Sequence, residues 1–256
     1  MPIWIEKEDV FGMKRSAAES EKLIVALDVA TIERAQALVN RLSRTVKTFK
    51  IGSQLYCAAG PKAIRIVRKQ HCEVFLDLKF YDIPSVVSKA AEALVAQRVS
   101  MFTVHISGGM NMMTELVKTV DRAAKKFAVR RPKILGVTVL TSINDDDLKE
   151  FGIKRFLKDQ VIYLAQVAKN AGLDGVIASA EEAHRIKQVC AKDFLVVTPG
   201  VRPRGSKAGD QKRIMTPRQA ISEGADYIVV GRPVVESPDP LKVARAILKE
   251  ITPRKK

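Results

Sequence analysis

The sequence predicts an α/β fold, a (β/α)8 barrel of the TIM type in which eight parallel strands alternate with helices. Short apolar runs alternate with helix-like segments eight times between residues 23 and 251. Eight such units in roughly 250 residues is the usual size of this barrel. The strands should pair in parallel, because a crossover helix returns the chain to the same end of the sheet. A doubly wound open sheet is the competing fold, but it calls for a glycine-rich turn after the first strand, and residues 28–31 read Asp-Val-Ala-Thr.

Each predicted element rests on a local pattern. The first strand is an apolar run that ends in Asp28, and Thr31 is a suitable N-cap for the helix that follows. Pro84 opens a helix in its first turn, and Gly152 should interrupt the long polar segment after the fifth strand. The expected strands are 23–28, 46–51, 75–80, 101–105, 134–140, 175–178, 194–198 and 227–230. The expected helices are 31–42, 61–70, 84–97, 111–127, 145–170, 180–190, 217–222 and 241–251.

The barrel is expected to occupy most of the chain. Residues 1–20 show no convincing period and are predicted to form an N-terminal extension, with a short helix near residues 13–19. Residues 21–256 are predicted to form a single catalytic barrel domain. Within it, residues 199–214 are rich in glycine and basic side chains, and we expect an irregular loop there.

Composition narrows the classes of function. The net charge of +16 favours anionic partners, among them a phosphorylated small molecule. The basic residues are spread along the chain and are not interleaved with its few aromatics, so no nucleic-acid partner is expected. No apolar run reaches the roughly 18 residues of a membrane span, and the N-terminus lacks a signal-peptide core, which predicts a cytoplasmic protein without membrane contact. The three cysteines and three histidines are scattered, so neither a redox pair nor a metal site is predicted.

Charged residues interrupt the third strand. Side chains two apart in a strand share a face, so Asp77 and Lys79 should point one way and the apolar Leu76 and Leu78 the other. Asp82 follows where this strand should end. Charges packed this closely must neutralise one another or a ligand, because an unpaired charge removed from water is costly.

The ends of the neighbouring strands carry charges of both signs. Catalytic residues of this fold lie at the carboxyl ends of the strands, a region we call the barrel mouth. Asp28 ends the first strand, and Lys50 lies near the end of the second. Together with Asp77 and Lys79, they should bring two acids and two lysines together from three adjacent strands. A core ion pair is the alternative for any one of them alone.

A second signal lies after the seventh and eighth strands, where many barrels of this type bind phosphate. Glycines there let the backbone approach an anion, and an arginine can grip it with two hydrogen bonds. Arg232 follows an apolar strand directly and precedes a proline, which a merely solvated loop residue would not explain. The predicted phosphate loops contain Gly200, Arg202, Gly205, Gly209, Gln211, Gly231 and Arg232.

With these residues, the chain resembles the orotidine 5'-monophosphate decarboxylase family of the single-domain bacterial and archaeal type, from about residue 23 to residue 251. The most specific match is the D-x-K-x-x-D pattern of Asp77, Lys79 and Asp82. The other matching stretches are 26–28 (ALD), 50–52 (KIG), 137–142 (VTVLTS), 199–202 (PGVR), 210–211 (DQ) and 230–233 (VGRP).

The resemblance implies a function and a catalytic set. The implied reaction is the decarboxylation of orotidine monophosphate to UMP and carbon dioxide, in pyrimidine biosynthesis, without a cofactor or a metal. Lys79 is implied to protonate C6 of the pyrimidine, and Asp77 to face the substrate carboxylate. Asp28 and Lys50 are implied to contact the ribose, with Lys50 also tying the charged groups together. Asp82 is implied to reach the active site of a second subunit, which makes the expected partner another copy of the chain in a homodimer.

The resemblance also implies contacts around the pyrimidine and the phosphate. Thr141 should lie near the base and Gln211 between base and phosphate. The implied substrate contacts beyond the charged groups are Ile83, Thr141, Pro199, Arg202, Gln211, Gly231 and Arg232. One departure from the family pattern is Val86, which stands where many members carry a threonine whose hydroxyl lies near the ribose.

Three other functions remain open from the sequence. The magnesium-dependent hexulose-phosphate synthase and ketogulonate-phosphate decarboxylase group shares the D-x-K-x-x-D pattern, but its members carry a glutamate ligand at the position of Lys50. An aldolase could form a Schiff base on Lys79 or Lys50. A phosphate- or nucleic-acid-binding barrel without catalysis would use Arg232 but would have no need of Asp77 and Lys79.

Overall fold

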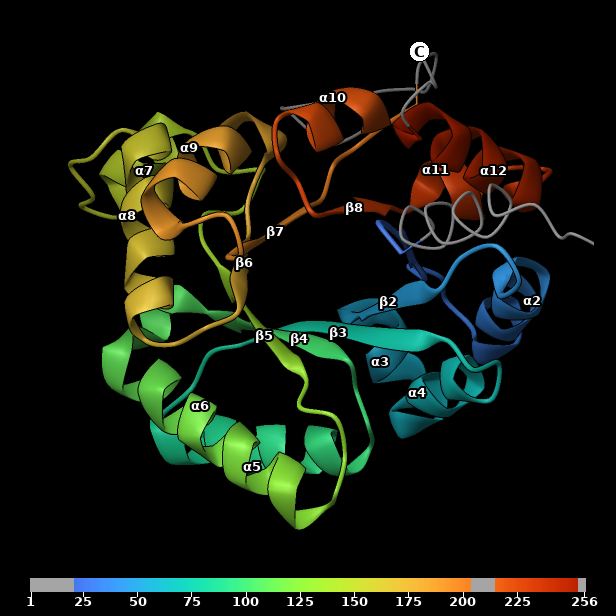
Figure 1. The fold of residues 1–256 in the computed structure, drawn as a ribbon, viewed down its shortest axis with the longest axis horizontal. Coiled ribbons are helices and arrows are strands. Elements are labelled where there is room, and N and C mark those ends of the chain that lie inside the picture. Colours follow the sequence, from blue (N-terminus) through green and yellow to red (C-terminus); the bar gives the residue numbers. More distant parts are fainter. Residues whose placement is uncertain (1–20, 204–214, 253–256) are drawn as a thin grey trace, which may run out of the picture.

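Eight parallel strands form a closed barrel in the computed structural model, which describes residues 21–203 and 215–252 (Figure 1). The strands follow sequence order around the barrel, and β8 pairs with β1 to close it. The predicted fold is confirmed. The strands are β1 (Leu23–Ala26), β2 (Thr48–Gly52), β3 (Glu73–Phe80), β4 (Met101–His105), β5 (Lys133–Val137), β6 (Gly175–Ile177), β7 (Leu195–Thr198) and β8 (Tyr227–Val230).

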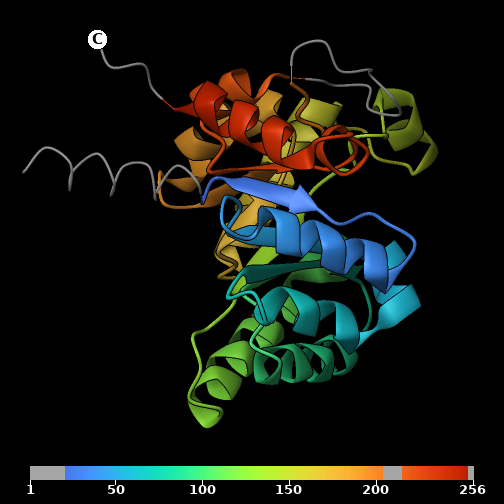
Figure 2. The same ribbon diagram turned by 90° about the vertical axis from the view of Figure 1, so that its right-hand side faces the viewer.

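Helices surround these strands (Figures 1 and 2). Two short helices that the sequence pattern did not predict, α3 and α11, directly follow β2 and β8. The expected helix 145–170 is two helices, separated around Gly152 as predicted. The described helices are α2 (Ile32–Leu42), α3 (Ser53–Ala59), α4 (Pro61–Arg68), α5 (Pro84–Ala96), η1 (Ile106–Gly108), α6 (Gly109–Lys126), α7 (Asp145–Glu150), α8 (Leu157–Asn170), α9 (Ala180–Cys190), α10 (Pro217–Ser222), α11 (Arg232–Val235) and α12 (Pro240–Ile251). None of them combines the length and apolarity that crossing a bilayer requires.

Local sequence explains where several helices begin and end. The Thr31 hydroxyl accepts a hydrogen bond from the Arg34 backbone, as expected for an N-cap. Gly60, with φ of 53°, separates α3 from α4, and Pro61 then occupies the first turn of α4. The expected helix near residues 13–19 lies outside the described residues.

Two apolar layers hold the barrel together. The larger layer lies between the strands and the helices. The smaller one fills the barrel interior and consists of Ile24, Ala26, Phe75, Met101, Leu135, Val197 and Val229. Strand side chains alternate between the two layers. A side chain two positions after Ala26 or Phe75 is therefore also on the interior side, and it lies nearer the barrel mouth.

Strand β3 is irregular at the position that matters for the site. Leu76 pairs with Phe102 and Phe80 pairs with Val104, so three residues of β3 lie opposite one residue of β4. Lys79 lies in this bulge with φ of 52°, a left-handed conformation that is uncommon outside glycine. The bulge therefore sets the direction of the Lys79 side chain.

Candidate active site

The four predicted charged residues meet at the barrel mouth. Lys50 Nζ lies 3.0 Å from Asp28 Oδ1 and 3.6 Å from Asp77 Oδ2. Lys79 Nζ lies 3.0 Å from Asp77 Oδ1. Acid and base thus alternate in a row, Asp28–Lys50–Asp77–Lys79, which we call the charged array. Its formal charges cancel.

Burial differs along the charged array. The inner pair is withdrawn from water, with side-chain exposures of 11% for Lys50 and 14% for Asp77. The outer residues are more open, at 37% for Lys79 and 45% for Asp28. A buried ion pair costs desolvation that its attraction only partly repays, so this arrangement is weak as a device for stability. Fixed charges in a dry setting are instead what electrostatic catalysis needs.

Gly52 allows the first pair of the charged array to form. A Cβ at this position would lie 2.9 Å from Asp28 Oδ1 and 3.0 Å from Lys50 Nζ. Both distances are shorter than normal contacts, so a side chain here would push the two groups apart. The glycine at the end of β2 is therefore required by close approach rather than by backbone conformation.

Two adjoining cavities open at the mouth and share Lys50, Asp77, Pro199 and Val229. The first, of about 600 Å³, is polar and extends toward the loops after β7 and β8. The predicted site residues that line it are Asp28, Lys50, Asp77, Pro199, Arg202, Gly231 and Arg232. We call it the phosphate compartment.

The second cavity, of about 390 Å³, is bounded mainly by apolar side chains from β3, β5, β6 and the loop after β5. The predicted site residues that line it are Lys50, Asp77, Lys79, Thr141 and Pro199. We call it the base compartment. The charged array lies where the two compartments join, so one ligand can reach both an anion site and an apolar slot while touching Lys79.

Arg202 is a built part of the phosphate compartment. It is 8% exposed, and its Nε has no hydrogen-bond partner among the described residues. A buried guanidinium donor without a partner is costly, and an anionic ligand would supply the missing acceptor. Arg232 begins α11 directly after Gly231, at the end of β8.

Two predicted residues do not line either cavity. Asp82 is exposed, and its Oδ1 accepts a hydrogen bond from the backbone of Ile83. Ile83 is itself 62% exposed and stands beside the exposed Tyr81 and Val86. Gln211 lies outside the described residues.

His105 flanks the array at the end of β4. Its ring packs on Tyr81 at a centroid distance of 5.4 Å. Burial, and to a lesser extent the charge of Lys79, lower the pKa of His105 below its ordinary value of 6.5. The imidazole is therefore neutral near pH 7 and adds no charge beside the array.

Sequence reasoning missed several residues of the site. Gln54 lines the phosphate compartment from α3, and Glu236 lines it from the end of α11. Phe75, Val137 and Ile177 form walls of the base compartment. The interior parity of their strands could have identified these last three, whereas Gln54 and Glu236 depend on the two unpredicted short helices.

Thr103 is a further residue that the sequence did not indicate. It is fully buried on β4, opposite the bulge of β3. Its Oγ1 lies 2.8 Å from the Lys79 backbone nitrogen and 3.0 Å from Asp77 Oδ1.

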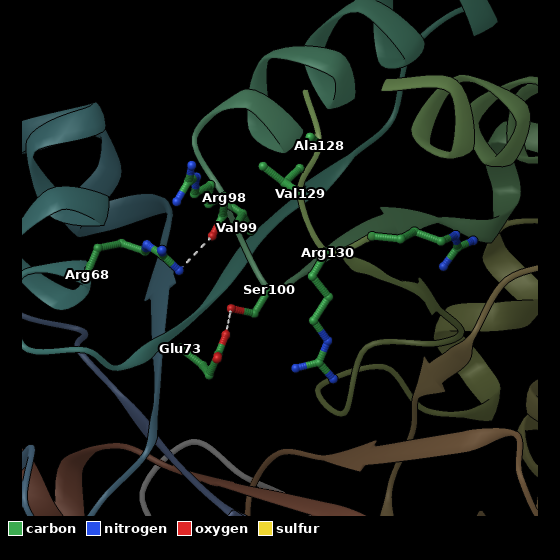
Figure 3. Close-up of a pocket in the computed structure, with 9 residues that line it drawn as sticks. Arg68, Glu73, Arg98, Val99, Ser100, Ala128, Val129 and Arg130 are labelled. Carbon is green, nitrogen blue, oxygen red and sulfur yellow. Dashed lines mark hydrogen bonds between the residues drawn. The ribbon is translucent and has the colours of Figure 1, made fainter. Parts of the chain in front are cut away.

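A different hollow lies at the other end of the barrel, where the strands begin. It has a volume of about 270 Å³, and Figure 3 shows Arg68, Arg98 and Arg130 around it. Arg68 donates to the carbonyl oxygen of Arg98, and Glu73 is hydrogen-bonded to Ser100 (Figure 3). It contains no alternating acids and bases like those of the charged array. Among the described residues of the whole chain, no three His, Cys, Asp or Glu side chains are grouped as a metal site would need.

Comparisons with known proteins agree with the resemblance seen in the sequence. The sequence profile of the orotidine 5'-phosphate decarboxylase / HUMPS family matches residues 21–247. The orotidine 5'-phosphate decarboxylase of Moorella thermoacetica is 47% identical over 232 residues, which cover 90% of this chain and 92% of that protein. The enzyme of the same name from Geotalea daltonii is 46% identical over 93% of this chain and 99% of its own.

A solved structure gives the same answer. The crystal structure of orotidine 5'-phosphate decarboxylase from Lactobacillus acidophilus superposes with a TM-score of 0.80 at 35% identity. It covers 91% of this chain and 100% of that one. The chain belongs to the orotidine 5'-phosphate decarboxylase / HUMPS family.

Proposed function

We propose that this protein decarboxylates orotidine 5'-phosphate to UMP and carbon dioxide, with the charged array as its catalytic centre and without a metal or an organic cofactor. The observation that carries the proposal is the position of Lys50 between two carboxylates, 3.0 Å from Asp28 and 3.6 Å from Asp77. Close relatives over nearly the whole chain carry the name of this enzyme.

The two compartments match the two ends of this substrate. The phosphate would bind Arg202 and Arg232 in the phosphate compartment, where glycines leave the backbone open to an anion. The pyrimidine would enter the base compartment beside Thr141, and the ribose hydroxyls would meet Asp28 and Lys50. Binding energy from the distant phosphate then holds C6 against Lys79.

In the chemical step, the ammonium of Lys79 is the proton donor. The bond between C6 and the carboxylate carbon breaks, carbon dioxide leaves, and the electron pair remains on C6 as a vinylic carbanion. Lys79 stabilises this developing charge and then transfers a proton from Nζ to C6, which gives UMP. The neutral amine regains its proton from solvent. Asp77 holds the ammonium in place through the 3.0 Å contact.

The assembly we propose is a homodimer in which Asp82 completes the site of the partner subunit. Asp82 is exposed and lines neither cavity of its own chain. Exposed apolar side chains surround it, namely Tyr81 and Ile83 at 65% and 62% and Val86 at 46%. Such a cluster is typical of a protein interface. We also propose a cytoplasmic location, and a catalytic domain that begins near residue 21, where the family match begins.

The magnesium-dependent group within the same family is the main competing function. A cation cannot ligate a cation, so Lys50 disfavours a magnesium site at this position. The Schiff-base alternative requires a lysine amine that is free to attack a carbonyl, whereas each lysine here forms an ion pair with a carboxylate at 3.0 Å.

Turnover of orotidine 5'-phosphate in EDTA tests the proposal. We expect the wild type to be fully active and Lys79→Ala to retain almost no activity. Lys126→Ala is the matched control, because this exposed lysine on α6 pairs with Glu92 far from the mouth. A folded wild type that is inactive in EDTA and active with added magnesium would overturn the assignment. So would undiminished turnover by Lys79→Ala.

Subunit exchange tests the shared site. Asp82→Ala and Lys79→Ala should each be inactive alone, and mixtures that have exchanged subunits should recover up to about a quarter of wild-type activity. One of the two sites in each mixed dimer then carries both native residues. Well-exchanged mixtures that stay inactive would show that each site is built from one chain.

A further inference from the structure

We propose that Thr103 is a positioning residue of the reaction, whose single hydroxyl sets both the backbone of Lys79 and the carboxylate of Asp77. The inference rests on the proposed function and adds a residue that the sequence pattern does not indicate. Thr103 lies on β4, two positions beyond the interior residue Met101, so its side chain also points into the barrel.

The hydrogen bonds of this hydroxyl have only one possible direction. The backbone N–H of Lys79 donates to Thr103 Oγ1 over 2.8 Å. The hydroxyl proton is then left to be donated to Asp77 Oδ1, 3.0 Å away. One oxygen thus accepts from the main chain of the proton donor and donates to the acid that holds it.

The accepting oxygen of Asp77 is shared. Asp77 Oδ1 receives the Thr103 hydroxyl and the Lys79 ammonium, each at 3.0 Å, while Oδ2 faces Lys50 at 3.6 Å. Without the hydroxyl, the carboxylate keeps its two lysines but loses the contact that fixes its rotation. Lys79 Nζ would then follow the carboxylate away from its place.

The bulge in β3 explains why a side chain has this role. Three residues of β3 lie opposite the single residue Thr103, so the regular pairing with β4 is interrupted there. Lys79 adopts φ of 52° within the bulge, which costs free energy for a residue with a Cβ. The hydroxyl satisfies the N–H of this strained residue, and it does so from a fully buried position where water would not readily replace it.

The experiment compares Thr103→Val, which has nearly the same shape without the hydroxyl, with Thr103→Ser, which retains it. Thr48→Val is the matched control, since Thr48 is also a buried strand threonine but lines a hollow at the opposite end of the barrel. For each protein we would measure kcat and KM for orotidine 5'-phosphate, the dissociation constant of UMP and the melting temperature.

We expect Thr103→Val to lose about 10- to 100-fold in kcat, because small misplacements of a reacting group have effects of this size. KM and the affinity for UMP should change less than about threefold, because the ligand-binding residues are untouched. Thr103→Ser and Thr48→Val should keep kcat within about threefold of the wild type.

A second readout isolates the placement of Lys79. An enzyme that protonates C6 must also exchange the C6 proton of the product for deuterium in D2O, and 5-fluoro-UMP makes this exchange easier because fluorine acidifies that position. Exchange should slow in Thr103→Val in proportion to kcat.

A wild-type kcat in Thr103→Val would overturn the inference, and so would equal losses of kcat in Thr103→Ser and Thr103→Val. A loss of kcat that is accompanied by an equal fold-loss of UMP affinity and by a lower melting temperature would also overturn it, since that combination indicates a merely structural role. Absence of decarboxylation in the wild type would instead overturn the proposed function.

Discussion

The two ends of the barrel differ in how their charged side chains are arranged. At the mouth, two lysines alternate with two carboxylates, and neighbouring groups lie within 3.6 Å of each other. At the end where the strands begin, Arg98 and Arg130 border a hollow without an ion pair to a described carboxylate, whereas Arg131 beside them pairs with Asp121 and Asp174. Arg98 and Arg130 are exposed, whereas Lys50 and Asp77 are largely buried.

The surplus positive charge of the chain is not carried by the charged array at the mouth. A net charge of +16 would permit a mouth full of cations, yet the charged array is formally neutral. Buried charges must be paired, while exposed ones are hydrated and need no partner. Pairing therefore follows burial at both ends of the barrel, and at the mouth the paired charges also line the two compartments.

The sharpest test of this comparison removes one cation from each end. Lys50→Ala should lower kcat/KM by about 10²- to 10³-fold, because it leaves Asp28 and Asp77 without the charge between them. Arg130→Ala should stay within about twofold of the wild type, since an exposed charge distant from the mouth contributes little. Steady-state kinetics on both variants measures the contrast. Similar losses in the two would mean that the ends are not functionally distinct.

The same comparison can be made for anion binding. Arg232→Ala should weaken productive binding by about 10- to 100-fold in kcat/KM, because a charge-assisted contact to the phosphate is lost. Arg98→Ala, which removes the same side chain at the other end, should have no measurable effect on kcat/KM. Inorganic phosphate as a competitive inhibitor gives an independent measure, and its inhibition constant should rise only in Arg232→Ala.

Gly52→Ala tests whether the array depends on close approach. The added methyl group would lie 2.9 Å from Asp28 Oδ1 and 3.0 Å from Lys50 Nζ, so the pair must separate. We expect kcat/KM to fall about tenfold, with a melting temperature close to that of the wild type. A normal kcat/KM would show that the spacing of this pair is not critical.

His105 gives the smallest expected effect. Its folded pKa lies below the ordinary value, so the folded protein resists protonation more than the unfolded chain does. Well above pH 6.5, His105 is neutral in both states and does not affect the free energy of unfolding. Below that pH, the unfolded chain binds a proton more readily than the folded protein, so stability falls. The wild type should therefore lose about 1 to 2 °C more than His105→Asn between pH 7.5 and pH 5.5. Thermal melts at the two pH values measure the difference, and equal losses would contradict it.

The sequence predicted the fold well where the pattern is local. The apolar run of β8 and the proline-led helix α10 lie at the expected residues, because burial and capping act within a few positions. Strand β5 ends at Val137 rather than at residue 140, because its pairing with β6 stops at Ile177, the last residue of that strand. Helices α3 and α11 are too short for a periodic pattern to appear.

The candidate site was predictable in part for a related reason. Asp77 and Lys79 stand out because charges in a buried strand are unusual. Asp28 and Lys50 were predicted because they lie at strand ends, which is where a barrel of this type carries its catalytic residues. Thr103 does not stand out, because a threonine is ordinary in a strand. Its importance depends on a bulge in the neighbouring strand, which no pattern along β4 reveals. Asp82 shows the converse, since its motif is specific but its contacts within one chain are few.

The division of the mouth into two compartments has a consequence for how such a barrel can change. The phosphate compartment is lined mainly by residues after β7 and β8, together with Asp28 after β1 and Gln54 from α3, and the base compartment mainly by residues of β3, β5 and β6. Under the proposed function, substitutions on one side of the barrel can thus alter which ring is accepted while the binding of the phosphate is left intact. Only Lys50, Asp77, Pro199 and Val229 belong to both compartments, and a change at any of these four would alter both at once.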